Sequence, residues 1–127
     1  QAVARTMKER GYGKIINVIS TAGVYGTVGQ INYASAKAGL IGFTKSASRE
    51  LGGANINVNC VEIGVIDTEM TEKIRTDPKL QETYLNRIQL RRFGKVEDVS
   101  PIFVFLGSDE SSYITAQVIG VDGGYVG

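Results

Sequence analysis

The stretch KIINVIS at residues 14–20 decides the fold class of this chain. It is rich in β-branched residues and apolar at consecutive positions, which is typical of a strand buried on both faces of a parallel sheet. The run INVNCVE at residues 56–62 repeats the pattern, and a shorter run at residues 117–121 precedes a glycine-rich turn. These three runs are therefore predicted to be the strands of one sheet.

Four helical patterns precede and separate the strands. They lie at residues 1–10, 32–51, 71–86 and 96–106. Gly52 and Gly53 are typical of a helix end, and Pro78 is typical of a helix start. Residues 21–31 are expected to form a glycine-rich loop. The alternation of helices and strands predicts an α/β fold, a doubly wound parallel sheet with helices on both faces.

Three strands are only half of such a sheet, and an edge strand without its partners would expose an apolar ladder. The chain also begins at Gln1, without a methionine and inside a helical pattern. We therefore expect further sequence upstream, with residues 1–127 forming the second half of a larger domain.

Composition narrows the class of protein. The chain has 127 residues, 43% hydrophobic and 21% charged, with a net charge of +1, which is ordinary for a soluble globular protein. It has no basic run for nucleic acid, no apolar run long enough for a membrane span and no recognisable signal peptide. A single cysteine, Cys60, and the absence of histidine argue against disulfides, zinc, haem and histidine-based catalysis. We expect a reducing, cytoplasmic location, with no metal, nucleic-acid or membrane partner.

Tyr33 and Lys37 are the first candidates for chemistry. They are four residues apart in the predicted helix 32–51, so their side chains share a face. A free tyrosine titrates near a pKa of about 10, and a fixed ammonium beside it favours the phenolate. Such a pair would suit general acid–base catalysis near neutral pH. The alternative is a surface tyrosine and a solvated lysine, which is the commoner outcome for this spacing in isolation.

Ser20 ends the first predicted strand, and the loop after the second strand begins near the same edge of the sheet. Sites in open α/β sheets form beyond these strand ends. A serine there can donate a hydrogen bond to a carbonyl oxygen that gains charge during a reaction. The alternative is a serine that serves only the turn at the strand end.

Several stretches together resemble the short-chain dehydrogenase/reductase family, and most closely its 3-oxoacyl-[acyl-carrier-protein] reductase branch. The stretches are KIINVIS (14–20), GQINYASAKAGLIGFTKSASRE (29–50), INVNCVEIGVIDTEM (56–70), RRFGKVEDV (91–99), FLGSDESSYITAQ (105–117) and VDGG (121–124). The order and spacing of Ser20, Tyr33 and Lys37 match the catalytic serine, tyrosine and lysine of that family. The resemblance implies the C-terminal half of a Rossmann-like domain, with the nucleotide-binding half upstream.

The resemblance also implies an activity and its residues. The expected reaction is the interconversion of a ketone and a secondary alcohol with NAD or NADP, and the isolated chain is expected to be inactive. Tyr33 would exchange the proton, Lys37 would lower the pKa of Tyr33 and bind the nicotinamide ribose, and Ser20 would hold the substrate oxygen. The expected cofactor-binding residues are Tyr33, Lys37, Gly64, Ile66 and Thr68, and the expected substrate contacts are Ser20, Val24, Tyr25 and Gln30.

The family also implies a mobile lid at residues 67–94 and a homodimer or homotetramer. The oligomer would form through the helix that carries Gly39 and Gly42, whose glycines suggest close approach of another helix.

The sequence departs from the family pattern near the second strand. Ile63-Gly64 stands where Pro-Gly is usual, Glu62 stands where a small residue is preferred, and Ala116 stands where glycine is common. An unpaired buried carboxylate is costly, so we expect Glu62 to be solvated or paired. Two alternatives to the ketone–alcohol reaction stay open: an epimerase or dehydratase on the same scaffold, and a non-catalytic fragment or subunit. The sequence fixes neither the substrate nor the choice between NAD and NADP.

Overall fold

A three-stranded parallel sheet forms the centre of the structure, a computed structural model that describes residues 2–20 and 27–126. The strands are β1 (Gly13–Ser20), β2 (Ile56–Ile63) and β3 (Val118–Val121), in that order across the sheet. At one edge the register pairs Ser20 with Ile63 and Ile63 with Val121, so the carboxyl ends of all three strands meet there. The predicted parallel sheet is confirmed.

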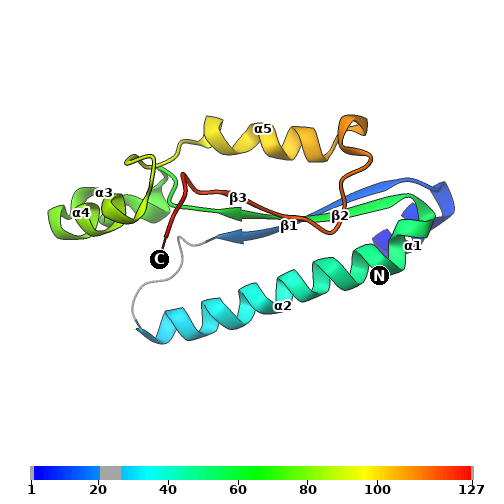
Figure 1. The fold of residues 1–127 in the computed structure, drawn as a ribbon, viewed down its shortest axis with the longest axis horizontal. Coiled ribbons are helices and arrows are strands. Elements are labelled where there is room, and N and C mark those ends of the chain that lie inside the picture. Colours follow the sequence, from blue (N-terminus) through cyan, green and yellow to red (C-terminus); the bar gives the residue numbers. More distant parts are fainter. Residues whose placement is uncertain (1, 21–26, 127) are drawn as a thin grey trace.

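Helices cover both faces of this sheet, as Figure 1 shows. Helix α5 (Val96–Leu106) lies on one face, and the long α2 (Thr27–Leu51) runs along the other. The remaining helices are α1 (Ala2–Arg10), α3 (Glu72–Thr76) and α4 (Pro78–Arg87), with 3₁₀ turns η2 (Gly52–Ala54), η3 (Glu69–Thr71) and η4 (Asp109–Ser111). Within the described ranges no helix is both long and apolar enough to cross a membrane.

Helix α2 begins earlier than the sequence predicted. Residues 27–31 were expected to belong to a glycine-rich loop, but they are the first five residues of the helix that contains Tyr33. A glycine inside a helix, here Gly29, costs about 1 kcal/mol relative to alanine. Each added helical residue gains a backbone hydrogen bond once the helix is nucleated, which offsets that cost. Residues 21–26 lie outside the described part of the chain.

The core forms on the α2 face at the amino end of β2. Ile56 and Val58 are almost fully buried there beside Leu51, and Met7 of α1 packs against them. Burying side chains of this size contributes about 1.5–3 kcal/mol each. This packing holds the C-terminal end of α2 against the sheet. It therefore also sets the orientation of the helix, and with it the position of the residues nearer its N-terminus.

Candidate active site

The candidate site lies at the sheet edge where the strands end. Ser20 is the last residue of β1 and lies beside Ile63, the last residue of β2. The next residue, Gly64, donates its backbone N–H to the carbonyl of Val121 at 3.0 Å, so the loop after β2 stays attached to β3. The serine and the loop that follows the second strand therefore share one edge, as the sequence predicted.

Tyr33 and Lys37 extend from α2 toward the same part of β2, and both reach Glu62. The Tyr33 hydroxyl donates to Glu62 Oε1 at 3.1 Å, and Lys37 Nζ donates to the same oxygen at 2.7 Å. The side chain of Glu62 is 16% exposed and that of Lys37 is 37% exposed. The expectation that Glu62 is paired is confirmed, and its partners are the two candidate catalytic residues.

This pairing changes the electrostatics of Tyr33. Burial of the phenol, then the charge of Glu62 and the hydrogen bond to it, raise the pKa of Tyr33 to about 12, with smaller contributions from Tyr125 and Asp122. A neighbouring anion disfavours the phenolate. The net lowering of this pKa that the pair with Lys37 indicated is not seen in this arrangement, because the carboxylate of Glu62 binds the ammonium and the phenol at once.

A cavity of about 400 Å³ opens at this edge, on the side of α5. Three residues predicted to bind a cofactor and the predicted catalytic serine line it: Gly64, Ile66, Thr68 and Ser20. Val99 and Phe103 of α5 contribute apolar walls. Cavities of this size that combine apolar walls with a few polar groups are typical of small-molecule sites.

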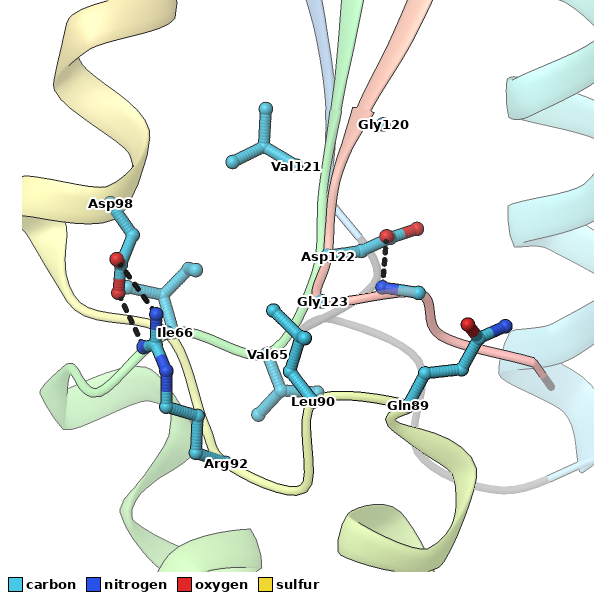
Figure 2. A pocket seen from close by; sticks show the side chains of 12 residues that line it. Val65, Ile66, Gln89, Leu90, Arg92, Asp98, Gly120, Val121, Asp122 and Gly123 are labelled. Carbon is cyan, nitrogen blue, oxygen red and sulfur yellow. Dashed lines mark hydrogen bonds and ion pairs between the residues drawn. The ribbon is translucent and has the colours of Figure 1, made fainter.

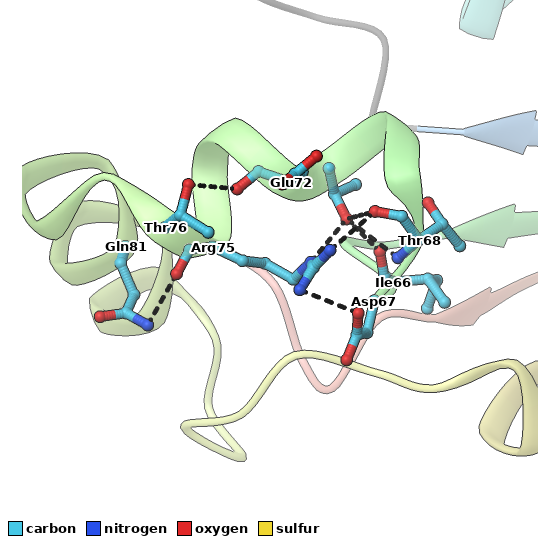
Figure 3. A network of polar contacts seen from close by, with 8 residues as sticks. Ile66, Asp67, Thr68, Glu72, Arg75, Thr76 and Gln81 are labelled. Carbon is cyan, nitrogen blue, oxygen red and sulfur yellow. Dashed lines mark hydrogen bonds and ion pairs between the residues drawn. The ribbon is translucent and has the colours of Figure 1, made fainter.

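A network of polar contacts (Figure 3) holds the loop between Ile66 and Thr68, two residues that line this cavity. Thr71, 1% exposed, donates its hydroxyl to the carbonyl of Ile66 and accepts the N–H of Thr68 at 3.2 Å. Arg75 Nε also donates to the Thr71 hydroxyl at 3.2 Å, and Arg75 Nη1 forms an ion pair with Asp67 at 2.9 Å. The side chains of Thr71 in η3 and Arg75 in α3 therefore hold the backbone between Ile66 and Thr68 in place.

The segment predicted to form a lid, residues 67–94, is closed at its base. Asp67 donates its N–H to the carbonyl of Gly94 at 2.8 Å, and Gly94 donates to the carbonyl of Val65 at 3.0 Å. Within the segment Ile74 and Ile88 are each 1% exposed, so it has more of a core than its polar sequence indicated. Its mobility stays a prediction.

A second cavity, of about 430 Å³ (Figure 2), shares the lining residue Ile66 with the first. It lies between the turn after β3 and the start of α5, with Asp122 and Leu90 on its walls. At its rim Arg92 forms two hydrogen bonds with Asp98, at 2.7 and 3.0 Å, and the pKa of Asp98 falls to about 2 because of that contact. Sequence reasoning did not identify this cavity, although the stretches RRFGKVEDV and VDGG, which form much of it, were visible.

Some predicted residues cannot be placed in the site. Val24 and Tyr25 lie outside the described residues, and Gln30 lies in α2 with its side chain outside them. Among the described residues nothing lies within 4 Å of a Cβ built on Gly39 or Gly42. The close approach expected at these glycines is therefore not made by the described part of this chain.

Comparisons with known proteins show which family this chain resembles. Residues 1–126 match the family described as enoyl-(acyl carrier protein) reductase. The chain is 54% identical over 126 residues to 3-oxoacyl-[acyl-carrier-protein] reductase FabG of Thermotoga maritima, and 48% identical over 123 residues to that of Chlamydia trachomatis. The alignments cover 99% and 97% of this chain, but 50% and 49% of the relatives. The chain thus spans about half the length of these curated relatives.

Solved structures give the same result. A putative 2-deoxy-D-gluconate 3-dehydrogenase from Agrobacterium tumefaciens with bound NADP matches with a TM-score of 0.87 at 35% identity, covering 98% of this chain and 51% of that one. A putative short-chain alcohol dehydrogenase from Sinorhizobium meliloti matches with a TM-score of 0.86 at 38% identity, covering 98% and 50%. The chain belongs to the short-chain dehydrogenase/reductase family, in the group described as enoyl-(acyl carrier protein) reductase.

Proposed function

We propose that the protein containing this chain is an NAD(P)-dependent oxidoreductase that interconverts a ketone and a secondary alcohol, with a 3-oxoacyl thioester on acyl carrier protein as its substrate. The observation that carries the proposal is the convergence of Tyr33 and Lys37 at the strand ends, next to the edge that Ser20 shares with Ile63. The names of the relatives, 3-oxoacyl-[acyl-carrier-protein] reductases at 44–54% identity, support the substrate class.

In this proposal each residue has a distinct role. Tyr33 gives a proton to the substrate oxygen during reduction and removes it during oxidation. Ser20 donates a hydrogen bond to the same oxygen, which stabilises the charge that develops on it. Lys37 holds the nicotinamide ribose and the phenol in place. Val24, Tyr25 and Gln30 remain proposed contacts for the rest of the substrate.

The described residues fit the nicotinamide end of such a cofactor. Gly64 lines the cavity. A Cβ built on Gly64 would lie 2.7 Å from Asp122 Cα, so the close contact between these two residues requires glycine. Ile66 and Thr68 line the same cavity and would hold the carboxamide. Tyr33 and Lys37 lie on the α2 side of the sheet, at Glu62. The cofactor supplies hydride transfer; the chain supplies binding, orientation and a proton.

The substitution Tyr33→Phe in the full-length protein tests this function. It should lower kcat for ketone reduction by about 10²–10⁴-fold, the usual contribution of a general acid, while the thermal unfolding curve changes little. Tyr113→Phe is the matched control, because Tyr113 is fully exposed and should leave kcat unchanged. If Tyr33→Phe retains full turnover, the catalytic assignment is wrong.

One observation favours the alternative of a non-catalytic subunit. A phenol with its pKa raised to about 12 is poorly placed to act as the base in alcohol oxidation near neutral pH. Absence of NAD(P) binding and of turnover in the full-length wild-type protein would support that alternative.

We further propose a cytoplasmic homodimer or homotetramer that uses the outer face of α2. In a helix without a partner, Gly42→Ala stabilises by about 1 kcal/mol. A loss of stability and of the oligomer, measured by thermal unfolding and by light scattering, would instead support close helix contact at Gly42.

A further inference from the structure

Glu62 is a charged residue that contacts the proposed catalytic pair, Tyr33 and Lys37, but has no role in the proposed reaction. It lies in β2, one residue before the strand ends, and faces α2. Its Oε1 atom accepts hydrogen bonds from the Tyr33 hydroxyl at 3.1 Å and from Lys37 Nζ at 2.7 Å. A side chain that touches both members of the pair can affect each of them directly.

The contact with Lys37 changes what the ammonium does for Tyr33. An ammonium beside a phenol favours the phenolate, because the charges attract. When the ammonium is in a close ion pair with a carboxylate, much of this attraction is cancelled. Glu62 is also mostly shielded from water, at 16% exposure, so solvent screens its charge less than it would at the surface.

The contact with Tyr33 acts in the same direction. A phenol donates a hydrogen bond to a carboxylate, whereas a phenolate next to the carboxylate would be repelled. The other groups whose charges reach Tyr33 are Asp122 and Tyr125, which also disfavour the phenolate. Apart from Tyr33 and Lys37, Glu62 influences the buried thiol of Cys60 on the same strand. The ammonium of Lys37 is therefore the group that favours phenolate in this described cluster.

We propose that Glu62 is a positioning residue that keeps Tyr33 as a neutral phenol and thereby sets the pH range of proton exchange with the substrate, an inference that rests on the proposed function. In reduction the Tyr33 O–H bond breaks as the O–H bond of the alcohol forms, and solvent then returns a proton to the phenolate. Oxidation needs the phenolate first. Glu62 thus makes the protein ready for reduction at neutral pH and moves alcohol oxidation to alkaline pH.

Tyrosine titration tests the coupling without any need for turnover. The full-length protein, labelled with ¹³C at the tyrosine ζ carbon, is titrated by NMR, and Tyr33→Phe assigns the Tyr33 signal. Glu62→Gln keeps an amide oxygen as acceptor but removes the charge, and it should lower the midpoint of Tyr33 by about 1 pH unit or more. Glu62→Ala, which has a small side chain, should shift it the same way. An unchanged midpoint in both variants overturns the inference.

Two carboxamide substitutions calibrate the titration. Asp122→Asn should shift the Tyr33 midpoint in the same direction by a smaller amount, because its influence on Tyr33 is weaker. Glu110→Gln, at the exposed η4 turn, should leave the midpoint where it is. A shift with Glu110→Gln as large as that with Glu62→Gln would mean that the effect is not local, and would also overturn the inference.

The pH profile of kcat/KM for alcohol oxidation then separates this inference from the proposed function. With Glu62→Gln the rising limb should move to lower pH by about the amount seen in the titration. A purely structural role for Glu62 would lower the rate without moving the limb. If Glu62→Gln moves the Tyr33 midpoint in the NMR titration but the wild-type protein has no turnover, only the proposed function is contradicted. Normal turnover with an unmoved limb would contradict the inference alone.

Discussion

Gly64 lies directly against the backbone of Asp122. A Cβ built on Gly64 would lie 2.7 Å from both Cα and Cβ of Asp122 and 3.3 Å from its carbonyl oxygen. Backbone cannot swing aside as the end of a flexible side chain can. We therefore expect Gly64→Ala to push β3 and the loop after β2 apart, and to lower the free energy of unfolding by about 1–3 kcal/mol in a urea titration.

Gly53→Ala is the matched control for Gly64→Ala. Gly53 lies in the η2 turn, and no described atom lies within 4 Å of a Cβ built on it. This substitution should change the free energy of unfolding by no more than about 1 kcal/mol, and in the stabilising direction. Equal losses from both glycines would contradict the argument from the contact with Asp122.

The sequence was sufficient for the sheet because a continuous apolar, β-branched run is a local signal for a strand, although only β2 is buried at consecutive positions here. The apolar, β-branched runs at residues 14–20 and 56–62 are the observed β1 and β2 to within one residue at each end. Pro78 opens α4 because proline suits the first turn of a helix, where its missing N–H costs nothing. Such local signals do not depend on how the chain folds at a distance.

The state of Tyr33 could not be predicted in this way. The i, i+4 spacing with Lys37 indicated a lowered pKa, whereas the contact with Glu62 raises it. Glu62 is 29 residues from Tyr33 in sequence, and its position depends on how α2 lies across β2. The sequence did indicate that Glu62 needs a partner, because a carboxylate near the end of a buried strand is costly alone.

Ala116 has a backbone conformation that favours glycine. Its φ is 63°, in the left-handed region, where a Cβ costs about 1–2 kcal/mol. Its backbone N–H donates to the carbonyl of Val58 at 2.7 Å, which holds the turn before β3 in this conformation. Ala116→Gly should therefore raise the free energy of unfolding by up to about 1 kcal/mol, part of the gain being lost to the freer unfolded chain.

Ala38→Gly gives the opposite result if this reasoning is correct. Ala38 lies in the middle of α2 and is exposed, so glycine there should cost about 1 kcal/mol. Thermal unfolding of both variants in one buffer makes the comparison. Destabilisation by Ala116→Gly as well would mean that the turn gains nothing from glycine and that the φ of residue 116 is not strained.

Thr71 fixes the loop under the proposed cofactor cavity through its hydroxyl. Thr71→Val keeps the shape of the side chain but removes the group that bonds Ile66, Thr68 and Arg75. Leaving these buried or partly buried groups without a partner should cost about 1–3 kcal/mol of stability. Because Ile66 and Thr68 line the cavity, the KM for NAD(P) in the full-length protein should rise, whereas kcat, which depends on Tyr33, should change less.

Thr83→Val separates this effect from the general loss of a threonine hydroxyl. Thr83 lies on the exposed side of α4, and its hydroxyl donates to the carbonyl of Lys79 at 2.9 Å, within the same helix. Removing it leaves that carbonyl accessible to water, so stability should change by less than about 0.5 kcal/mol and the KM should stay as it is. If Thr71→Val lowered stability but left the KM for NAD(P) unchanged, the loop between Ile66 and Thr68 would not be part of the cofactor site. The cavity at the end of β2 would then need another ligand.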